Sequence, residues 1–166
     1  QSLNIVFSDA TKGWIPLDDD VAAFEPVAPP TQRAIFGYGN AAGNVSMTNL
    51  VNSSGVVAAD VSGVGTARSQ LAAASYGGDK AIFGYGNSGS VSSLTNLVNN
   101  SGVVAADVSG VGTARSTLAA ASYGGDKAIF GYGGAYSSLT NLVNNSGVVS
   151  ADVTGVGTAR SLLAAT

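Results

Sequence analysis

The chain contains no cysteine and no histidine among its 166 residues. Disulfides and thiolate metal sites are therefore excluded, and the side chain that most often acts as a general base near neutral pH is missing. Charged residues make up only 10% of the sequence, against about 25% in an average protein. Seven Lys and Arg against ten Asp and Glu leave no basic face for phosphate, so we expect no nucleic-acid partner.

The sequence also has no apolar run of the roughly 18 residues that a membrane-spanning helix needs, so no membrane span is expected. What it has in quantity is glycine, with 23 residues, and small apolar residues within a hydrophobic fraction of 45%. Such a composition favours an ordered chain with many tight turns over a disordered one. The first residue is Gln1 rather than Met, which indicates either a processed mature chain or a trimmed one. We expect the protein to be extracellular or on a virion surface.

Three copies of one repeat occupy most of the chain. The segment AIFGYG begins at Ala34, Ala81 and Ala128, and TNLVN and GVGTARS recur with it. The spacing is 47 residues between the first two copies, and a two-residue shortening in the third copy is confined to one loop. We therefore predict a domain of three repeats, with boundaries at 34–80, 81–127 and 128–166, preceded by a different segment at 1–33. In closed repeat proteins this phasing lets the last strand pair beside the first.

Each repeat predicts β-strands. AIFGYG is a short apolar run that ends in glycines, and NNSG at 99–102 separates two apolar segments as a hairpin turn would. The Ala-rich stretch after the Arg, together with SSLTNLVNN, also allows short helices. We expect an all-β fold, with strands plus short helices as the alternative.

The stretch RSxLAAASYGGDKAIFGYG resembles the kelch motif of β-propeller blades, and the resemblance covers residues 34–166. In that family an Arg precedes a strand of small residues, and a Gly pair precedes an aliphatic-aromatic strand that ends in glycines. This chain departs from kelch in its Gly-Tyr-Gly and in lacking the Trp near the last strand of the blade. Because propellers have about four to eight blades, a β-trefoil, a β-prism or a ring completed by several chains are alternatives.

The first 33 residues combine an alternating segment, SLNIVF, with a linker that carries three of the four prolines. Together with TKGWIP and the Gly-, Ala- and Thr-rich repeats, this segment resembles parts of bacteriophage tail fibre and other virion appendage proteins. We predict a strand that docks either on its own repeat domain or on the sheet edge of a neighbouring subunit. The self-assembly residues of this arm are Leu3, Ile5, Phe7, Trp14 and Ile15.

GYGNSG satisfies the dinucleotide-binding pattern GxGxxG at Gly84, Gly86 and Gly89. The third copy reads GYGGAY and breaks the pattern, and no clear helix follows. We interpret these glycines as strand-end positions, and we expect no cofactor and no enzymatic activity.

An Asp precedes an Arg by eight residues in every repeat. Equal spacing in each copy predicts structural ion pairs or turn caps, within or between repeats, rather than three carboxylates around one cation. The residues are Asp60, Arg68, Asp107, Arg115, Asp152 and Arg160.

Asn-x-Ser sequons recur at the hairpin turn of every repeat. They are glycosylation candidates if the chain passes through a glycosylating pathway, and turn residues otherwise: Asn44, Asn52, Asn99 and Asn144. Tyr38, Tyr85 and Tyr132 recur at a strand end, where they form either a glycan-stacking platform or packing between repeats.

These patterns predict a non-enzymatic structural subunit of a self-assembling extracellular or virion fibre, whose partners are copies of itself. The alternative is a carbohydrate-binding β-repeat module that recognises surface carbohydrate.

Overall fold

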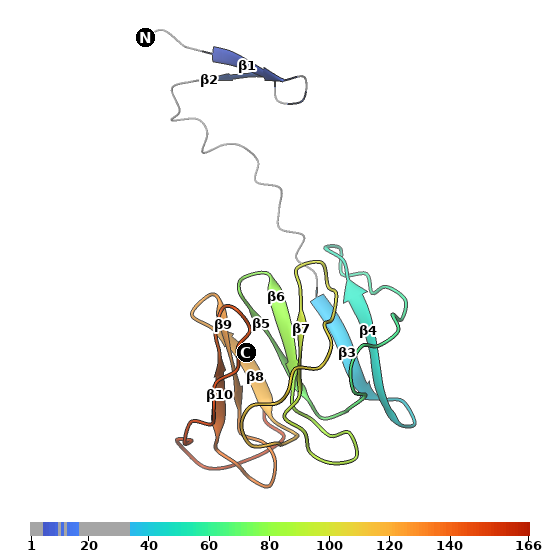
Figure 1. Ribbon diagram of the computed structural model, residues 1–166, viewed down its shortest axis with the longest axis vertical. Helices are drawn as coiled ribbons and strands as arrows, with labels where there is room; N and C mark the ends of the chain where they lie inside the picture. Colours follow the sequence, from blue (N-terminus) through green and yellow to red (C-terminus); the bar gives the residue numbers. More distant parts are fainter. Residues whose placement is uncertain (1–4, 10, 12, 17–33) are drawn as a thin grey trace. The chain divides into compact units, whose positions relative to one another are not determined.

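The computed structural model describes residues 5–9, 11, 13–16 and 34–166, and all of its regular elements are strands (Figure 1). The predicted all-β fold is confirmed, and the alternative with short helices is wrong for the described residues. Where we considered helices, the chain forms β5 (Ala72–Tyr76) and β7 (Thr95–Val98). The chain divides into two units, Gln1–Gln32 and Arg33–Thr166, which are described separately.

The first unit holds a β-hairpin rather than the predicted single strand. Strand β1 (Ile5–Asp9) pairs antiparallel with β2 (Gly13–Pro16), and the register places Phe7 opposite Trp14. The sequence GWIP forms the second strand through its backbone pairing with β1. Leu3 and the predicted Pro-rich linker lie outside the described residues.

The second unit consists of three small antiparallel sheets that follow one another along the chain (Figure 1). The strands of the described residues close no barrel, and no strand of one sheet pairs with a strand of another. Sheet 1 contains β3 (Ala34–Asn40) and β4 (Asn44–Val51). Sheet 2 has the order β5-β6-β7, with β6 at Lys80–Gly84, and sheet 3 has the order β8-β9-β10, with strands Ala119–Tyr123, Lys127–Gly131 and Thr140–Val143.

A fourth extended segment follows each sheet's last strand. In sheet 2, Val104 and Val108 form bridges to Val98 and Thr95, and the same bridges recur in sheets 1 and 3. The turn before this segment is the predicted hairpin: Asn99 accepts hydrogen bonds at Oδ1 from the N–H groups of residues 101 and 103. Each complete sheet therefore has four antiparallel segments in chain order.

The sheets are offset from the sequence repeats by one strand. Strand β5 lies at the end of the first repeat yet pairs with β6, and β8 lies at the end of the second yet pairs with β9. Among the described residues, β3 has a partner in β4 alone, so sheet 1 lacks the strand that β5 supplies to sheet 2.

The hydrophobic core lies mainly between the sheets. One cluster joins Ile82 and Tyr85 of sheet 2 to Phe130 and Val143 of sheet 3, and all four side chains are fully buried. A second cluster joins Tyr38 of sheet 1 to residues of sheet 2. Because small sheets of four segments bury little alone, contacts between neighbouring sheets supply the burial that stabilises each one.

Candidate functional site: the junctions between sheets

We call the region where two neighbouring sheets make contact a junction. A tyrosine in an unusual backbone conformation recurs at the equivalent position of each sheet. Tyr38, Tyr85 and Tyr132 have φ angles of 62°, 64° and 64°, in the left-handed region that L-residues rarely occupy. This conformation costs about 1–2 kcal/mol for a non-glycine residue, so surrounding contacts must hold it. Each tyrosine hydroxyl donates to a backbone carbonyl of the GVGTARS segment, at Val64, Val111 and Val156, over 3.0, 3.1 and 3.0 Å.

An arginine connects sheet 2 to sheet 3. The Arg115 guanidinium lies over the Tyr85 ring, 4.4 Å from its centroid. Its Nε donates to the Tyr132 carbonyl over 2.9 Å, Nη1 to the Thr113 carbonyl over 3.1 Å, and Nη2 to Asn141 Oδ1 over 2.6 Å. Arg115 is only 2% exposed, so these acceptors replace the water that an exposed guanidinium would bind.

The carboxylate of Asp152 completes this junction from sheet 3. It accepts hydrogen bonds at Oδ2 from the Thr113 N–H over 3.0 Å and the Thr113 hydroxyl over 2.7 Å. Asn141 Nδ2 donates to Asp152 Oδ1 over 3.0 Å, and Arg115 Nη1 lies 3.8 Å from the same oxygen. The ion pair is thus one part of a network in which every polar group has a partner.

Sheets 1 and 2 meet through the same set of contacts. Arg68 is fully buried, lies 4.4 Å from the Tyr38 ring centroid, and donates to the Tyr85 carbonyl and to Asn96 Oδ1 over 2.9 and 2.6 Å. Its ion pair is with Asp107, at 3.7 Å. Repetition of the same distances shows that the junction is a defined unit of the fold.

The network shifts the acidity of its members. At Asp152, hydrogen bonds from Thr113 lead the effects that lower the carboxyl pKa, and they outweigh the opposing effect of burial. At Asp107, burial is the largest single effect and raises the pKa, but hydrogen bonds from Thr66 and Asn96 with the Arg68 charge together lower it overall. Burial raises the pKa of Tyr85 to about 12. The carboxylates are therefore held ionised and the tyrosine neutral.

An aromatic ring of the following sheet covers a glycine at each junction. A Cβ placed on Gly84 would lie 2.6 Å from Phe130 Cζ, and one on Gly37 would lie 2.9 Å from Phe83 Cζ. The same rings pack edge to face against the tyrosines, with centroids 5.2 Å apart for both Tyr38–Phe83 and Tyr85–Phe130. The glycines are required here because the ring occupies the space of a side chain.

On the side of sheet 3 away from sheet 2, the described residues form only one half of a junction. Arg160 lies 4.4 Å from the Tyr132 ring centroid, as its equivalents do, and Nη1 donates to the Thr158 carbonyl over 3.2 Å. Within residues 34–166, no acceptor takes the place of Asn96 or Asp107. Gly131 has no ring over it: a Cβ placed there would have Thr140 Cγ2 as its nearest neighbour, at 3.4 Å.

On the side of sheet 1 away from sheet 2, the described residues form the other half of a junction. Asn49 Nδ2 donates to Asp60 Oδ1 over 2.8 Å and to the Ala58 carbonyl over 3.1 Å, as Asn141 does in the complete junction. No arginine of the described residues approaches Asp60. Phe36 is 63% exposed, whereas its equivalents Phe83 and Phe130 are 4% and 0% exposed.

The predicted Asp and Arg residues meet between neighbouring sheets rather than within one repeat. Arg68 pairs with Asp107 and Arg115 with Asp152, which leaves Asp60 and Arg160 at the two ends. We did not foresee the junction asparagines, threonines and phenylalanines, although each recurs at one position of every repeat: Asn49, Asn96, Asn141, Thr66, Thr113, Thr158, Phe36, Phe83 and Phe130.

The predicted glycan platform is wrong for two of its three tyrosines. Tyr38 is 8% exposed and Tyr85 is fully buried, because a Phe of the next sheet covers each ring. Only Tyr132, which has no following sheet, remains half-buried. A sugar therefore cannot stack on the repeated rings.

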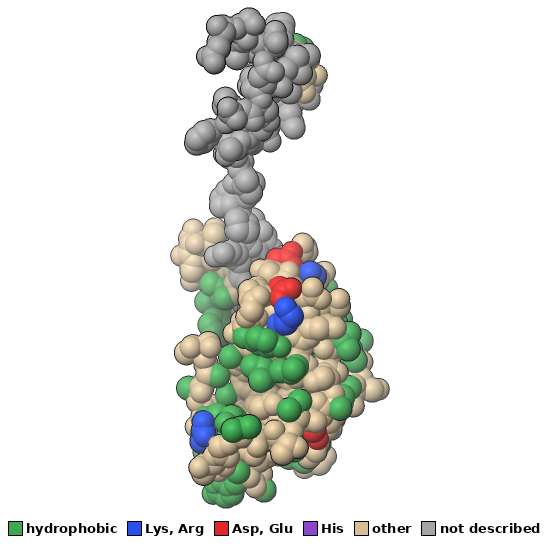
Figure 2. All heavy atoms as spheres, turned by 90° about the vertical axis from the view of Figure 1, so that its left-hand side faces the viewer, with side chains coloured by type: hydrophobic (Ala, Val, Ile, Leu, Met, Phe, Trp, Pro, Cys, Tyr) green, Lys and Arg blue, Asp and Glu red, His purple; other side chains and the backbone are tan. Residues whose placement is uncertain are grey.

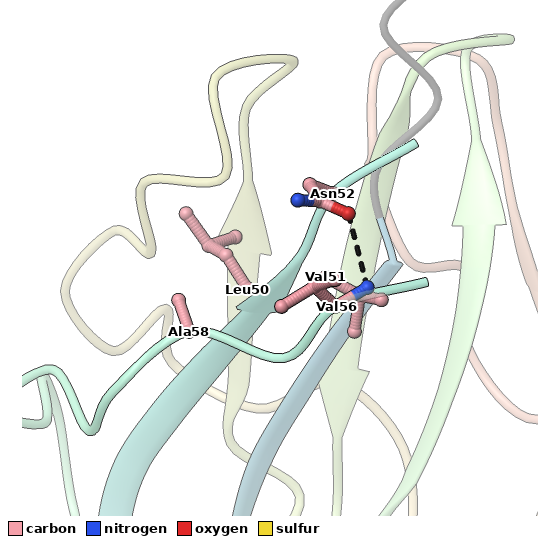
Figure 3. Close-up of a pocket in the computed structure, with 5 residues that line it drawn as sticks. All are labelled: Leu50, Val51, Asn52, Val56 and Ala58. Carbon is pink, nitrogen blue, oxygen red and sulfur yellow. Dashed lines mark hydrogen bonds between the residues drawn. The ribbon is translucent and has the colours of Figure 1, made fainter. Parts of the chain in front are cut away.

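The sequon asparagines all have structural contacts. The Oδ1 atoms of Asn52, Asn99 and Asn144 each accept two backbone N–H groups of their turn, and Asn44 Nδ2 donates to the Asn87 carbonyl. Asn52 and four apolar residues line an open hollow of about 250 Å³, and Figure 3 draws these residues as sticks: Leu50, Val51, Val56 and Ala58. Asn52 directs its oxygen to Val56 N–H, so the hollow offers few polar contacts for a sugar.

The part of the chain that the structure describes contains no cluster of three Asp or Glu side chains able to hold a metal ion. Of the three glycines of the GxGxxG match, Gly84 ends β6, whereas Gly86 and Gly89 lie in the loop that follows, with φ angles of 104° and 110°. No helix that could cross a membrane occurs among the described residues.

No family model and no curated protein sequence matches this chain. Among solved structures, the chain is similar to a fungal alcohol oxidase of the AA5 family, in complex with copper, with 15% sequence identity and a TM-score of 0.53. The match covers 74% of this chain and 28% of the oxidase chain. At this identity the likeness concerns the fold alone.

Proposed function

We propose that this protein is a non-enzymatic structural subunit of an extracellular or virion fibre, assembled with copies of itself. The observation that supports the proposal is that the recurring polar residues form contacts between sheets. In both complete junctions the Arg, Asp, Asn and Thr side chains bond to one another or to backbone, so the repeated chemistry serves to connect sheets.

The surface supports self-association. Figure 2, which views the side of the array where β8, β9 and β10 lie, shows hydrophobic patches among uncharged polar surface and few charged side chains. Valines of the fourth segments are exposed in all three sheets, with Val56, Val103 and Val148 at 61%, 61% and 62%. Low charge reduces the repulsion that keeps copies of a protein apart.

Light scattering and negative-stain microscopy of the purified chain at micromolar concentration test this proposal. We expect assemblies larger than one chain, with fibres in the micrographs. A chain that stays at the mass of one copy, 16.3 kDa, under all conditions would contradict it.

A further inference from the structure

The two ends of the sheet array carry opposite halves of one junction. The leading face, on sheet 1, consists of Phe36, the Tyr38 carbonyl, Asn49 and Asp60. The trailing face, on sheet 3, consists of Gly131, Tyr132, Thr158, Arg160 and residues 162–166. Each group on one face has its counterpart on the other in the junctions that the chain already contains.

We propose that copies of this chain join head to tail, with the trailing face of one copy bound to the leading face of the next. This inference rests on the proposed self-assembly and names its joint. Arg160 of one copy donates to the Tyr38 carbonyl and Asn49 Oδ1 of the other and pairs with Asp60, as Arg115 does with Tyr132, Asn141 and Asp152.

Charge complementarity favours a second copy as the occupant. The trailing face presents a cation, and the leading face presents a carboxylate that pairs with no cation of residues 34–166. Both halves are already in the geometry of the complete junction: Arg160 keeps the 4.4 Å stacking distance, and Asn49 keeps its bond to Asp60. Binding therefore costs little reorganisation.

The apolar parts of the two faces also fit. Phe36 is an exposed ring without a glycine beneath it, and Gly131 is a glycine without a ring above it. In the complete junctions, the equivalent rings are 4% and 0% exposed. Joining the faces buries an aromatic side chain that the single chain leaves in water.

Residues 162–166 supply the strand that sheet 1 lacks. Leu163, Ala164 and Ala165 are equivalent to Leu118, Ala119 and Ala120, which lead into or form β8. The backbone is set for this role, since Leu162 has a φ of 56° and its N–H donates to the Thr117 carbonyl, as the N–H of Thr117 does to Gln70. By the register of β8 on β9, Ala164 then pairs with Gly37 and Ala165 with Phe36 of the next copy. The joint thus combines the addition of a strand to sheet 1 with the side-chain contacts of Arg160.

Two single-face variants separate this joint from other contacts. Asp60→Lys damages only the leading face, by repelling Arg160, and Arg160→Leu damages only the trailing face. Asp126→Lys and Lys127→Leu are matched controls, because Asp126 and Lys127 form an exposed pair in a turn. Circular dichroism checks that all four variants fold, and sedimentation velocity gives their masses with that of the unaltered chain.

We expect the unaltered chain and both controls to assemble, and each single-face variant alone to sediment as one chain of 16.3 kDa. An equimolar mixture of the two face variants should form a 1:1 complex, because one intact leading face and one intact trailing face are then present. Assembly by either face variant alone, or failure of the mixture to associate, overturns the head-to-tail joint while leaving self-assembly intact.

The mass of the unaltered chain separates the joint from the fibre proposal. Long assemblies support both. A closed pair of copies supports the joint and contradicts fibre growth through it; such a pair has six sheets, within the four to eight blades of closed propellers. A single chain at every concentration overturns both proposals.

Discussion

Replacement of Arg115 by methionine is expected to uncouple sheet 3 from sheet 2. The change keeps an unbranched side chain of similar length but removes all donors to the Tyr132 carbonyl, the Thr113 carbonyl and Asn141 Oδ1. It also leaves Asp152 without its cation. Each acceptor left buried without a donor costs about 1–3 kcal/mol, whereas the exposed Asp152 keeps its hydrogen bonds from Thr113 and Asn141.

Summed over these acceptors, we expect a loss of about 3–5 kcal/mol in the free energy of unfolding, measured by urea denaturation, which leaves the ionic strength unchanged. Arg68→Met should cost a similar amount, since Arg68 makes the same bonds at the other complete junction. Arg115→Lys should recover only a small part, because an ammonium group cannot reproduce the fork of the guanidinium.

Lys127→Met is the matched control, because it removes a cation of an exposed ion pair with Asp126 and should change stability by less than about 1 kcal/mol. Measurements at low protein concentration keep self-association out of the comparison. If Arg115→Met were as mild as Lys127→Met, the junction network would not be what holds neighbouring sheets together.

Other consequences follow from the same junctions. Gly84→Ala should lose about 1–3 kcal/mol of stability by thermal or urea unfolding because its Cβ meets the Phe130 ring, while Gly131→Ala should be much milder in the single chain. Folding lowers the pKa values of Asp107 and Asp152, so these carboxylates stabilise the fold above about pH 4 and lose this effect as the pH falls further. Urea titrations from pH 6 to pH 2 should show the loss of stability. Asp152→Asn should make that pH dependence smaller. In an ultraviolet titration Tyr85 should ionise near its raised pKa of about 12, so Tyr85→Phe should remove one tyrosine from the part of the curve near pH 12, and a curve unchanged by that substitution would contradict its burial.

Repetition made the fold class accessible from the sequence. Apolar runs that end in glycine favour β-strands, and Asn-rich turns such as that at Asn99 favour hairpins. Tertiary contacts do not change these local preferences. The hairpin of the first unit was missed because we assigned no strand to GWIP from its sequence. Its strand state depends on pairing with β1, which is information that a local pattern does not contain.

The partners of the repeated polar residues were not accessible in the same way. Every copy carries an Asp and an Arg at one spacing, so the sequence does not say whether Arg68 bonds to Asp60 or to Asp107 of the next sheet. The answer depends on the left-handed Tyr38 and on the offset between sheets and repeats. The same offset buries the tyrosines under Phe83 and Phe130, which removes the predicted sugar platform.

The central claim is that the contact joining sheets within one chain also joins copies, and a disulfide trap tests its register. The sequence has no cysteine, so single-cysteine variants report on one position each. In the register of β8 on β9, Thr166 of one copy lies opposite Ile35 of the next, and opposite residues of antiparallel strands have Cα atoms about 4.5–5.5 Å apart, within disulfide range. Mixing Thr166→Cys with Ile35→Cys in a glutathione buffer should give a cross-linked heterodimer, well above the yield from Thr166→Cys with the exposed Ser53→Cys. Equal yields from the two mixtures would contradict the head-to-tail joint.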